Sequence, residues 1–222
     1  MKLLGYSERG IMNAVFYHIA LTNDADLLKE ILKLGEFDGF NVDDIHDVEM
    51  YIEASLSDYG SPDLVIKLSD ANDRKHIIFF EAKVQGYGGE QRAWEKFQIN
   101  ERYNGYSSNL FYQLYLKQFF MSSTDEQLTD GRQDRLEDTT PRKIGNNTVV
   151  LNLSGVLRAD APNIHLCAII PDDNVENREI EGLPVHFIRW NQIEQLCSQE
   201  NHQFILDTFN WNGDQIYRGR QE

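Results

Sequence analysis

SPDLVIKLSDANDRKHIIFFEAKV (residues 61–84) contains two apolar runs, 63–68 and 76–84, joined by a polar linker. The linker is rich in turn-forming residues, so the stretch predicts an antiparallel β-hairpin. The second run ends with Glu81 and Lys83, although a charge within an apolar strand is costly to bury without a partner. These charges indicate either a solvated strand end carrying an ion pair or a functional site.

Hairpin geometry brings three charged residues together. With the turn centred near Asn72, Asp63 lies opposite Glu81, because side chains alternate faces with period 2. Directly opposed residues point the same way, so Asp63, Glu81 and Lys83 are expected in one patch at the open end of the hairpin. Pro62 fits there, since proline is tolerated as the first residue of a strand.

Two opposed carboxylates repel each other unless a cation lies between them. Carboxylate oxygens suit a hard ion such as Mg²⁺ or Mn²⁺, and Mg²⁺ commonly keeps several waters besides one or two carboxylates. Such an ion lowers the pKa of a bound water and polarises a phosphoryl oxygen. The ammonium of Lys83 is suited to orient that water or to stabilise charge on phosphorus. This chemistry predicts hydrolysis of a phosphodiester.

The pattern Pro62-Asp63, eighteen residues to Glu81, then Ala82-Lys83 resembles the PD-(D/E)XK nuclease superfamily. The resemblance implies a restriction-endonuclease-like α/β fold, with a mixed central β-sheet flanked by helices. It implies that Asp63 and Glu81 ligate the metal, that the carbonyl of Ala82 adds a ligand, and that Lys83 assists the water. It also implies a nucleic-acid substrate, for which we expect DNA in preference to RNA.

The resemblance brings in two supporting residues, each with an ordinary alternative. Family members often carry an acidic residue in the first helix, where this chain has Glu8, but glutamate is also favoured at helix N-termini by the macrodipole. Relatives often carry Gln with Tyr four residues later. This chain has Gln113 but Lys117 at the second position, so that signature is not met. Gln113 contacts substrate or the water near Lys83, or lies with Lys117 on a solvated helix edge.

The stretch 86–103 has two interpretations. Gly86–Gly89 follows the strand and lacks the ending of a phosphate-binding P-loop, so we interpret it as a flexible flap. Arg92, Lys96 and Arg102 alternate with aromatic residues and could grip a nucleic-acid strand. Neighbouring glutamates offset their charge, and an ordinary amphipathic helix explains them equally well.

The rest of the chain predicts one α/β domain over residues 1–222. The expected helices cover 7–21, a segment capped by Asp24, 90–100, a helix from Ser107 or Ser108 to about Met121, and 192–209. Further strands are expected at 48–56, 148–153, 165–171 and 184–190. Glu49 and Glu53 share one face of the first, most simply as its polar outer side. Residues 122–148 are polar and indicate an exposed loop insertion.

Composition limits the function. The chain carries 36 Asp and Glu against 21 Lys and Arg, a net charge of −15, which argues against a broad DNA-coating surface. A partner subunit or a second protomer could supply that surface. Neither a membrane span nor a signal peptide is expected, and two cysteines indicate a reduced, cytoplasmic setting. The alternative function is a catalytically silent nuclease-fold module that acts through protein–protein contacts.

Overall fold

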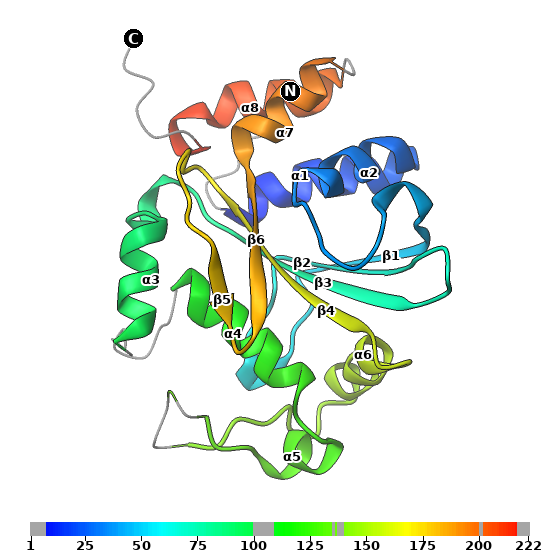
Figure 1. The fold of residues 1–222 in the computed structure, drawn as a ribbon, viewed down its shortest axis with the longest axis vertical. Helices are drawn as coiled ribbons and strands as arrows, with labels where there is room; N and C mark the ends of the chain where they lie inside the picture. The colour runs from blue at the N-terminus through cyan, green and yellow to red at the C-terminus, as the bar shows by residue number, and fades with distance from the viewer. Residues whose placement is uncertain (1–7, 100–108, 135, 137–139, 200–201, 217–222) are drawn as a thin grey trace.

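The computed structural model describes residues 8–99, 109–134, 136, 140–199 and 202–216. The protein is an α/β protein in which a six-stranded mixed sheet has helices on both faces (Figure 1). The strands are β1 (His46–Ile52), β2 (Leu64–Ser69), β3 (Lys75–Ala82), β4 (Asn163–Ile170), β5 (Arg178–Ile180) and β6 (Leu183–Arg189). Their order is β1-β2-β3-β4-β6-β5, so the first three form a meander and the sheet is mixed as predicted.

The β2–β3 hairpin has the predicted register. Leu64 pairs with Phe80 and Ser69 with Lys75, and the same register continued by one residue sets Asp63 opposite Glu81. Asp70 stabilises the turn, because its Oδ1 accepts hydrogen bonds from the backbone N–H groups of Asn72 and Arg74. Strand β1 pairs antiparallel with β2, while β4 pairs parallel with both β3 and β6.

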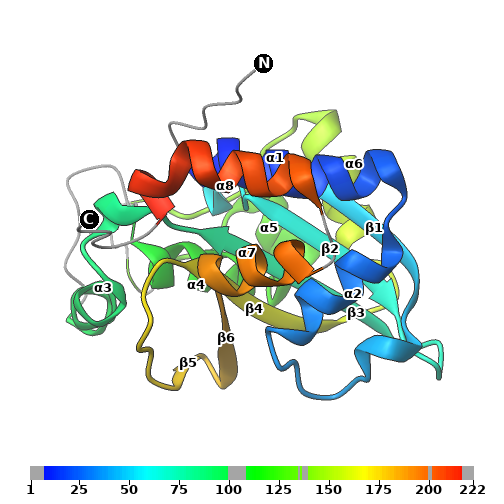
Figure 2. The same cartoon turned by 90° about the horizontal axis from the view of Figure 1, so that it is seen from above.

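The helices form a layer on each face of the sheet. Helices α1, α2, α7 and α8 cover one face, as the view in Figure 2 shows, and α3, α4, α5 and α6 lie toward the other (Figures 1 and 2). Their bounds are α1 (Glu8–Thr22), α2 (Ala25–Lys33), α3 (Glu90–Gln98), α4 (Leu110–Met121), α5 (Asp125–Asp130), α6 (Thr148–Arg158), α7 (Trp190–Gln199) and α8 (Gln203–Ile216). Short 3₁₀ turns are η1 (Val42–Asp44), η2 (Ser57–Tyr59) and η3 (Gln85–Tyr87).

Alternation along the central strands divides the core into two apolar clusters. On β2 and β3, Leu64, Ile66 and Phe80 face the α1 side, whereas Val65 and Phe79 face the α4 side. Both faces of these strands are buried, which explains their nearly continuous apolar sequence. Asp63 and Glu81 have the same parity as Val65 and Phe79, so the hairpin presents its carboxylates on the face that α4 covers.

Helix caps agree with the sequence in part. Asp24 caps α2 as predicted, because its side chain accepts a hydrogen bond from the backbone of Leu27. Asn109 caps α4, with its side chain accepting from Phe111 and Tyr112, so neither Ser107 nor Ser108 fills that position. Both serines lie outside the described residues, as do Ser7 and Arg102.

Two predictions about the second half are wrong, and one strand there was not predicted. Residues 148–153 form the start of helix α6, because Asn147 caps the helix and its apolar face is buried at Val150 and Leu157. The final helix is two helices, α7 and α8, and the short strand β5 was not predicted.

The segment 122–148 is not simply an exposed polar loop. It contains helix α5, and Leu128, Asp134 and Ile144 are buried. The carboxylate of Asp134 accepts hydrogen bonds from the Tyr112 and Tyr115 hydroxyl groups on α4 and from Nε of Arg142. This network ties the segment to the core.

Two sequence-level exclusions bear on the described residues. None of their helices combines the length and the apolar character that a membrane crossing requires. The two cysteines, Cys167 and Cys197, are buried and free, in agreement with the expected absence of a disulfide scaffold.

Candidate active site

The three residues of the sequence pattern lie where the hairpin opens. Asp63 precedes β2, Glu81 is the penultimate residue of β3, and Lys83 follows that strand directly. All three side chains are almost fully buried, with residue exposures of 4%, 1% and 3% respectively. The alternative of a solvated strand end is therefore wrong.

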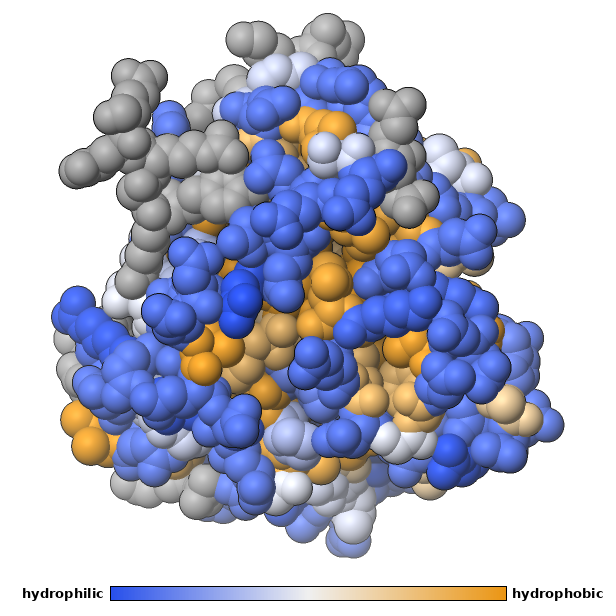
Figure 3. Space-filling model, turned by 45° about the horizontal axis from the view of Figure 1, so that its top comes forward, coloured by the Kyte–Doolittle hydropathy of each residue, from blue (hydrophilic) through white to orange (hydrophobic). Residues whose placement is uncertain are grey.

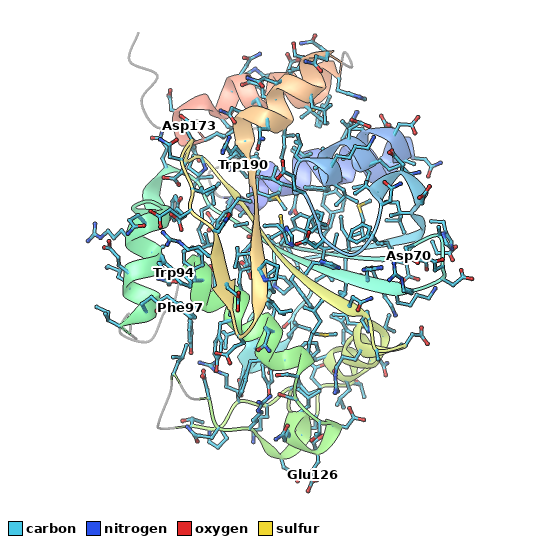
Figure 4. The ribbon with its side chains drawn as sticks, in the orientation of Figure 1. Asp70, Trp94, Phe97, Glu126, Asp173 and Trp190 are labelled. Carbon is cyan, nitrogen blue, oxygen red and sulfur yellow. The ribbon has the colours of Figure 1, made fainter. Side chains whose placement is uncertain are left out.

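Main-chain hydrogen bonds fix this strand end. Asp63 Oδ2 accepts a 2.8 Å hydrogen bond from the backbone N–H of Ala82, which ties the two strands together at the site. Lys83 donates its backbone N–H to the Ile169 carbonyl at 2.8 Å. Its own carbonyl accepts from the indole Nε1 of Trp190 at 2.8 Å, and Figure 4 shows Trp190 where β6 meets α7. Ile169 belongs to β4 and Trp190 directly follows β6, and both strands run parallel to β3. The sheet itself therefore positions Lys83.

Electrostatics at Asp63 are those of a crowded acidic pair. Burial, followed by the nearby Glu81 carboxylate, raises the pKa of Asp63 to about 6. The Ala82 N–H and the Lys83 ammonium act in the opposite direction but do not compensate. Arg9 Nε of α1 lies 3.4 Å from Asp63 Oδ1, with the arginine side chain about half exposed. Asp63 is thus a carboxylate held in a site where its negative charge is unfavourable without a further cation.

Glu81 is paired with Lys117, a residue of α4 that the sequence did not place in the site. Lys117 Nζ lies 3.2 Å from Glu81 Oε1 and donates a 2.9 Å hydrogen bond to the carbonyl of Tyr59. Lys117 is only 1% exposed, so the interpretation of Lys117 as part of a solvated helix edge is wrong. Burial lowers the pKa of Lys117, and the neighbouring Glu81 only partly offsets that effect.

The supporting residues divide into one that joins the cluster and one that does not. Glu8 begins α1, and its Oε1 lies 3.7 Å from Lys83 Nζ. Gln113 lies one turn before Lys117 on α4. Its Oε1 is buried and has no hydrogen-bond partner among the described residues. Gln113 therefore makes no hydrogen bond with Asp63, Glu81 or Lys83 in the described part of the chain.

The acidic residues of β1 and the loop after it take no part in the carboxylate pair. Glu53 donates its backbone N–H to the carbonyl of Asp63, but its exposed side chain accepts from Asn13 on α1. Glu49 accepts from the hydroxyl of Tyr51, also at the surface. Their polar outer-face interpretation fits these contacts.

The donor set fits a hard divalent cation better than a zinc ion. Glu81 Oε1, although within ion-pair distance of Lys117, has no hydrogen-bond donor among the described residues. No group of three or more His, Cys, Asp or Glu side chains able to hold a metal occurs in the described part of the chain. A cation here would therefore use Asp63, Glu81, a backbone carbonyl such as that of Ala82, and water, a set that suits Mg²⁺.

A small cavity is lined by residues that come after Lys83 in the sequence. It has a volume of about 140 Å³ and is lined by residues of η3, α3 and the start of α4: Gly86, Tyr87, Gly88, Arg92, Ala93, Lys96, Asn109 and Leu110. Arg92 is exposed and makes no hydrogen bond or ion pair with another described residue. Glu90 does not neutralise it, because Glu90 is buried and its Oε1 accepts a 2.7 Å hydrogen bond from Arg178 Nε.

Sequence reasoning found the hairpin residues and missed those that reach them from elsewhere. Arg9 of α1 contacts Asp63 and Lys117 of α4 contacts Glu81, in both cases across more than 30 residues of chain, and Tyr59 of η2 accepts a hydrogen bond from Lys117. One sequence signal pointed to Lys117. It lies four residues after Gln113, where members of the PD-(D/E)XK superfamily, which the pattern resembles, often carry Tyr.

A scan against protein-family models gave no match, and searches of curated proteins and of solved structures gave no significant match either.

Proposed function

We propose that the protein is a Mg²⁺- or Mn²⁺-dependent nuclease of the PD-(D/E)XK type that hydrolyses phosphodiester bonds, preferentially in DNA. The observation that carries the proposal is the buried, opposed pair Asp63–Glu81 with Lys83 at the end of β3. An ordinary core does not retain two facing carboxylates, because burying like charges together is unfavourable. The mixed sheet flanked by helices supports the same proposal, since the resemblance implies that architecture.

Each residue has a defined task in this proposal. Asp63, Glu81 and the Ala82 carbonyl would hold the cation, which when bound supplies a water of lowered pKa and polarises a phosphoryl oxygen. Lys83 orients the attacking water and stabilises negative charge that develops on the phosphate. Glu8 and Arg9 are the more exposed members of the cluster, so substrate would approach past the start of α1.

Two measurements test this function. Calorimetry with Mg²⁺ or Mn²⁺ should detect binding to the wild type that Asp63→Asn and Glu81→Gln abolish, since each isosteric change removes one anionic ligand. Cleavage of supercoiled, linear and single-stranded DNA should fall by about 10²-fold or more in Lys83→Ala, as is usual when a group that assists proton transfer is lost. Lys67→Ala is the matched control, because Lys67 is buried on the same face of β2 but donates to the Val156 carbonyl.

One observation favours the catalytically silent module as the second candidate. Asp63 and Glu81 are nearly closed to solvent, and each lies within ion-pair distance of a basic side chain of the protein itself. If the wild type binds neither cation, or if it and Lys83→Ala cleave DNA equally, the metal-dependent nuclease is excluded and the module remains.

A further inference from the structure

The charged cluster at the hairpin end contains more cations than the sequence pattern predicts. Among the described residues, three ion pairs meet there: Arg9 with Asp63, Lys83 with Glu8, and Lys117 with Glu81. Three positive and three negative side chains cancel one another. With all six groups ionised, the formal charges of the cluster balance without metal, and a divalent cation would add two positive charges.

The surroundings of Lys117 are built to hold an ammonium group. Its Nζ donates to the Tyr59 carbonyl at 2.9 Å and lies 3.2 Å from Glu81 Oε1, inside a region almost without solvent. The next residue, Gly60, has φ of +78°, and a Cβ added there would lie 3.0 Å from that nitrogen. Glycine at position 60 thus leaves the room that the ammonium occupies.

Stability alone does not explain this arrangement. A buried ion pair is often no better for folding than apolar residues of similar volume, because desolvation costs as much as the attraction returns. An apolar side chain at this position of α4 would serve a purely structural purpose. The lysine instead places its charge 3.2 Å from Glu81 Oε1, a buried carboxylate oxygen.

We propose that Lys117 is a built-in counter-ion of the Asp63–Glu81 site, holding Glu81 in the metal-free protein and competing with the divalent cation for it. The inference rests on the proposed metal-dependent function. A cation that binds Glu81 must share the carboxylate with the ammonium or displace it, so Lys117 lowers the affinity of the site for metal. Lys117 is a positioning residue, because it acts through Glu81 and has no contact with a substrate in this scheme.

The test compares metal binding and stability in two lysine variants. Lys117→Met should bind Mn²⁺ about tenfold or more tightly than wild type in calorimetry, because a like charge about 4 Å away repels by several RT at the effective dielectric of a protein interior. Without metal the variant should melt at a lower temperature than wild type, and saturating Mn²⁺ should raise its melting temperature by more. Lys67→Met is the control and should leave Mn²⁺ affinity unchanged, since Lys67 is also buried but its ammonium donates to Val156.

The outcomes separate this inference from the proposed function. If wild type and Lys117→Met bind Mn²⁺ equally, or the variant binds more weakly, the counter-ion role is wrong while the metal site stands. If neither protein binds Mn²⁺, both proposals fail. Should Lys117→Met not fold, Lys117→Gln gives the same comparison, because its amide keeps a donor for Tyr59 and Glu81 without the charge.

Discussion

Asp63 is a buried carboxylate whose ionised form is disfavoured by its surroundings. Its two oxygens contact only the Ala82 N–H and the half-exposed Arg9 side chain among the described residues, while Glu81 adds a second negative charge nearby. Burial and that neighbouring charge together raise its pKa to about 6 from the ordinary 3.8. A group with a raised pKa binds a proton more readily in the folded than in the unfolded protein. Ionising it therefore costs folding free energy.

Asp63→Asn should stabilise the metal-free protein near neutral pH. As pH rises from about 4 through the folded-state pKa of about 6, the wild type loses up to roughly 3 kcal/mol, whereas the neutral amide loses nothing at this position. Urea unfolding with a chelator present, at about pH 4 and about pH 7.5, measures the difference. The two proteins should differ at the higher pH and converge at the lower.

Asn210→Gln, an exposed change without a titratable group, is the control and should shift stability equally at both pH values. An Asp63→Asn protein that is less stable than wild type at both pH values would contradict the prediction, because the carboxylate would then contribute to folding.

At the scale of elements, the sequence predicted those structures whose cause is local. The β2–β3 hairpin follows from two apolar runs and a turn-forming linker, and its register then fixes Asp63 against Glu81. Helix α6 was mistaken for a strand because Thr148, Val149 and Val150 are β-branched. Its cap and its packing on the core outweigh that weak preference.

The same distinction applies to the site. Asp63, Glu81 and Lys83 belong to one hairpin, so period-2 alternation brings them together. Lys117 reaches Glu81 only because α4 packs across the sheet, a contact between residues far apart in the chain that no local pattern predicts. Its burial could not be anticipated, since a lysine on a helix is ordinarily at the surface.

Three neighbouring strands carry a histidine cluster on the opposite face from Glu81. His76 on β3, His165 on β4 and His186 on β6 are buried beside one another, with Phe37 against His165 and His186 and Phe40 against His76. His76 Nδ1 lies 3.1 Å from His165 Nε2, so one ring donates and the other accepts. Burial, then the adjacent His76 and His186, lowers the pKa of His165 to about 3.

Acid should therefore destabilise the fold through this cluster. A histidine whose pKa is lowered in the folded state stays neutral while the unfolded chain takes up protons. The folding stability that this histidine contributes is therefore complete above about pH 6.5 and declines toward about pH 3. The decline contributed by His165 is up to about 1.4 kcal/mol per pH unit. His165→Gln should show a flatter dependence of unfolding free energy on pH between about 6.5 and 4.5 in urea titrations.

Asn210→Gln, an exposed change without a titratable group, supplies the comparison and should keep the wild-type slope. A wild-type slope in His165→Gln would show that acid acts elsewhere.

At the scale of the whole molecule, charge and architecture act in opposite directions on a nucleic-acid substrate. The net charge of −15 repels a polyanion, and the face in Figure 3 is largely hydrophilic with smaller apolar patches. The parallel strands β3, β4 and β6 nevertheless end on one side of the sheet, where Lys83 lies with Arg9 and Lys117, each paired with an acidic side chain. Local fields decide what a site attracts, so DNA contact is expected only there.

Arg92 is the residue at which this expectation is most directly tested. It lines the cavity formed with Gly86 and Gly88, a few residues after Lys83, and has no ion-pair partner among the described residues. If its guanidinium contacts one phosphate, Arg92→Ala should weaken binding of a labelled DNA and reduce the slope of log K against log salt by about 0.7 to 0.9. Fluorescence anisotropy over a salt series without Mg²⁺ measures that slope.

Lys29→Ala is the matched control, since it changes the net charge of the molecule by the same amount. Lys29 donates to the Asp43 carbonyl. The segment 39–44, which contains Asp43, lies beside the hairpin turn, because Arg74 of the turn donates to the Gly39 carbonyl. Figure 4 shows Asp70 at this turn, at the opposite end of the hairpin from the candidate site. A contact at Arg92 predicts that Lys29→Ala keeps the wild-type slope. Equal slopes in all three proteins would mean that Arg92 meets no phosphate, and an acidic chain would then need a partner to hold DNA at Asp63 and Glu81.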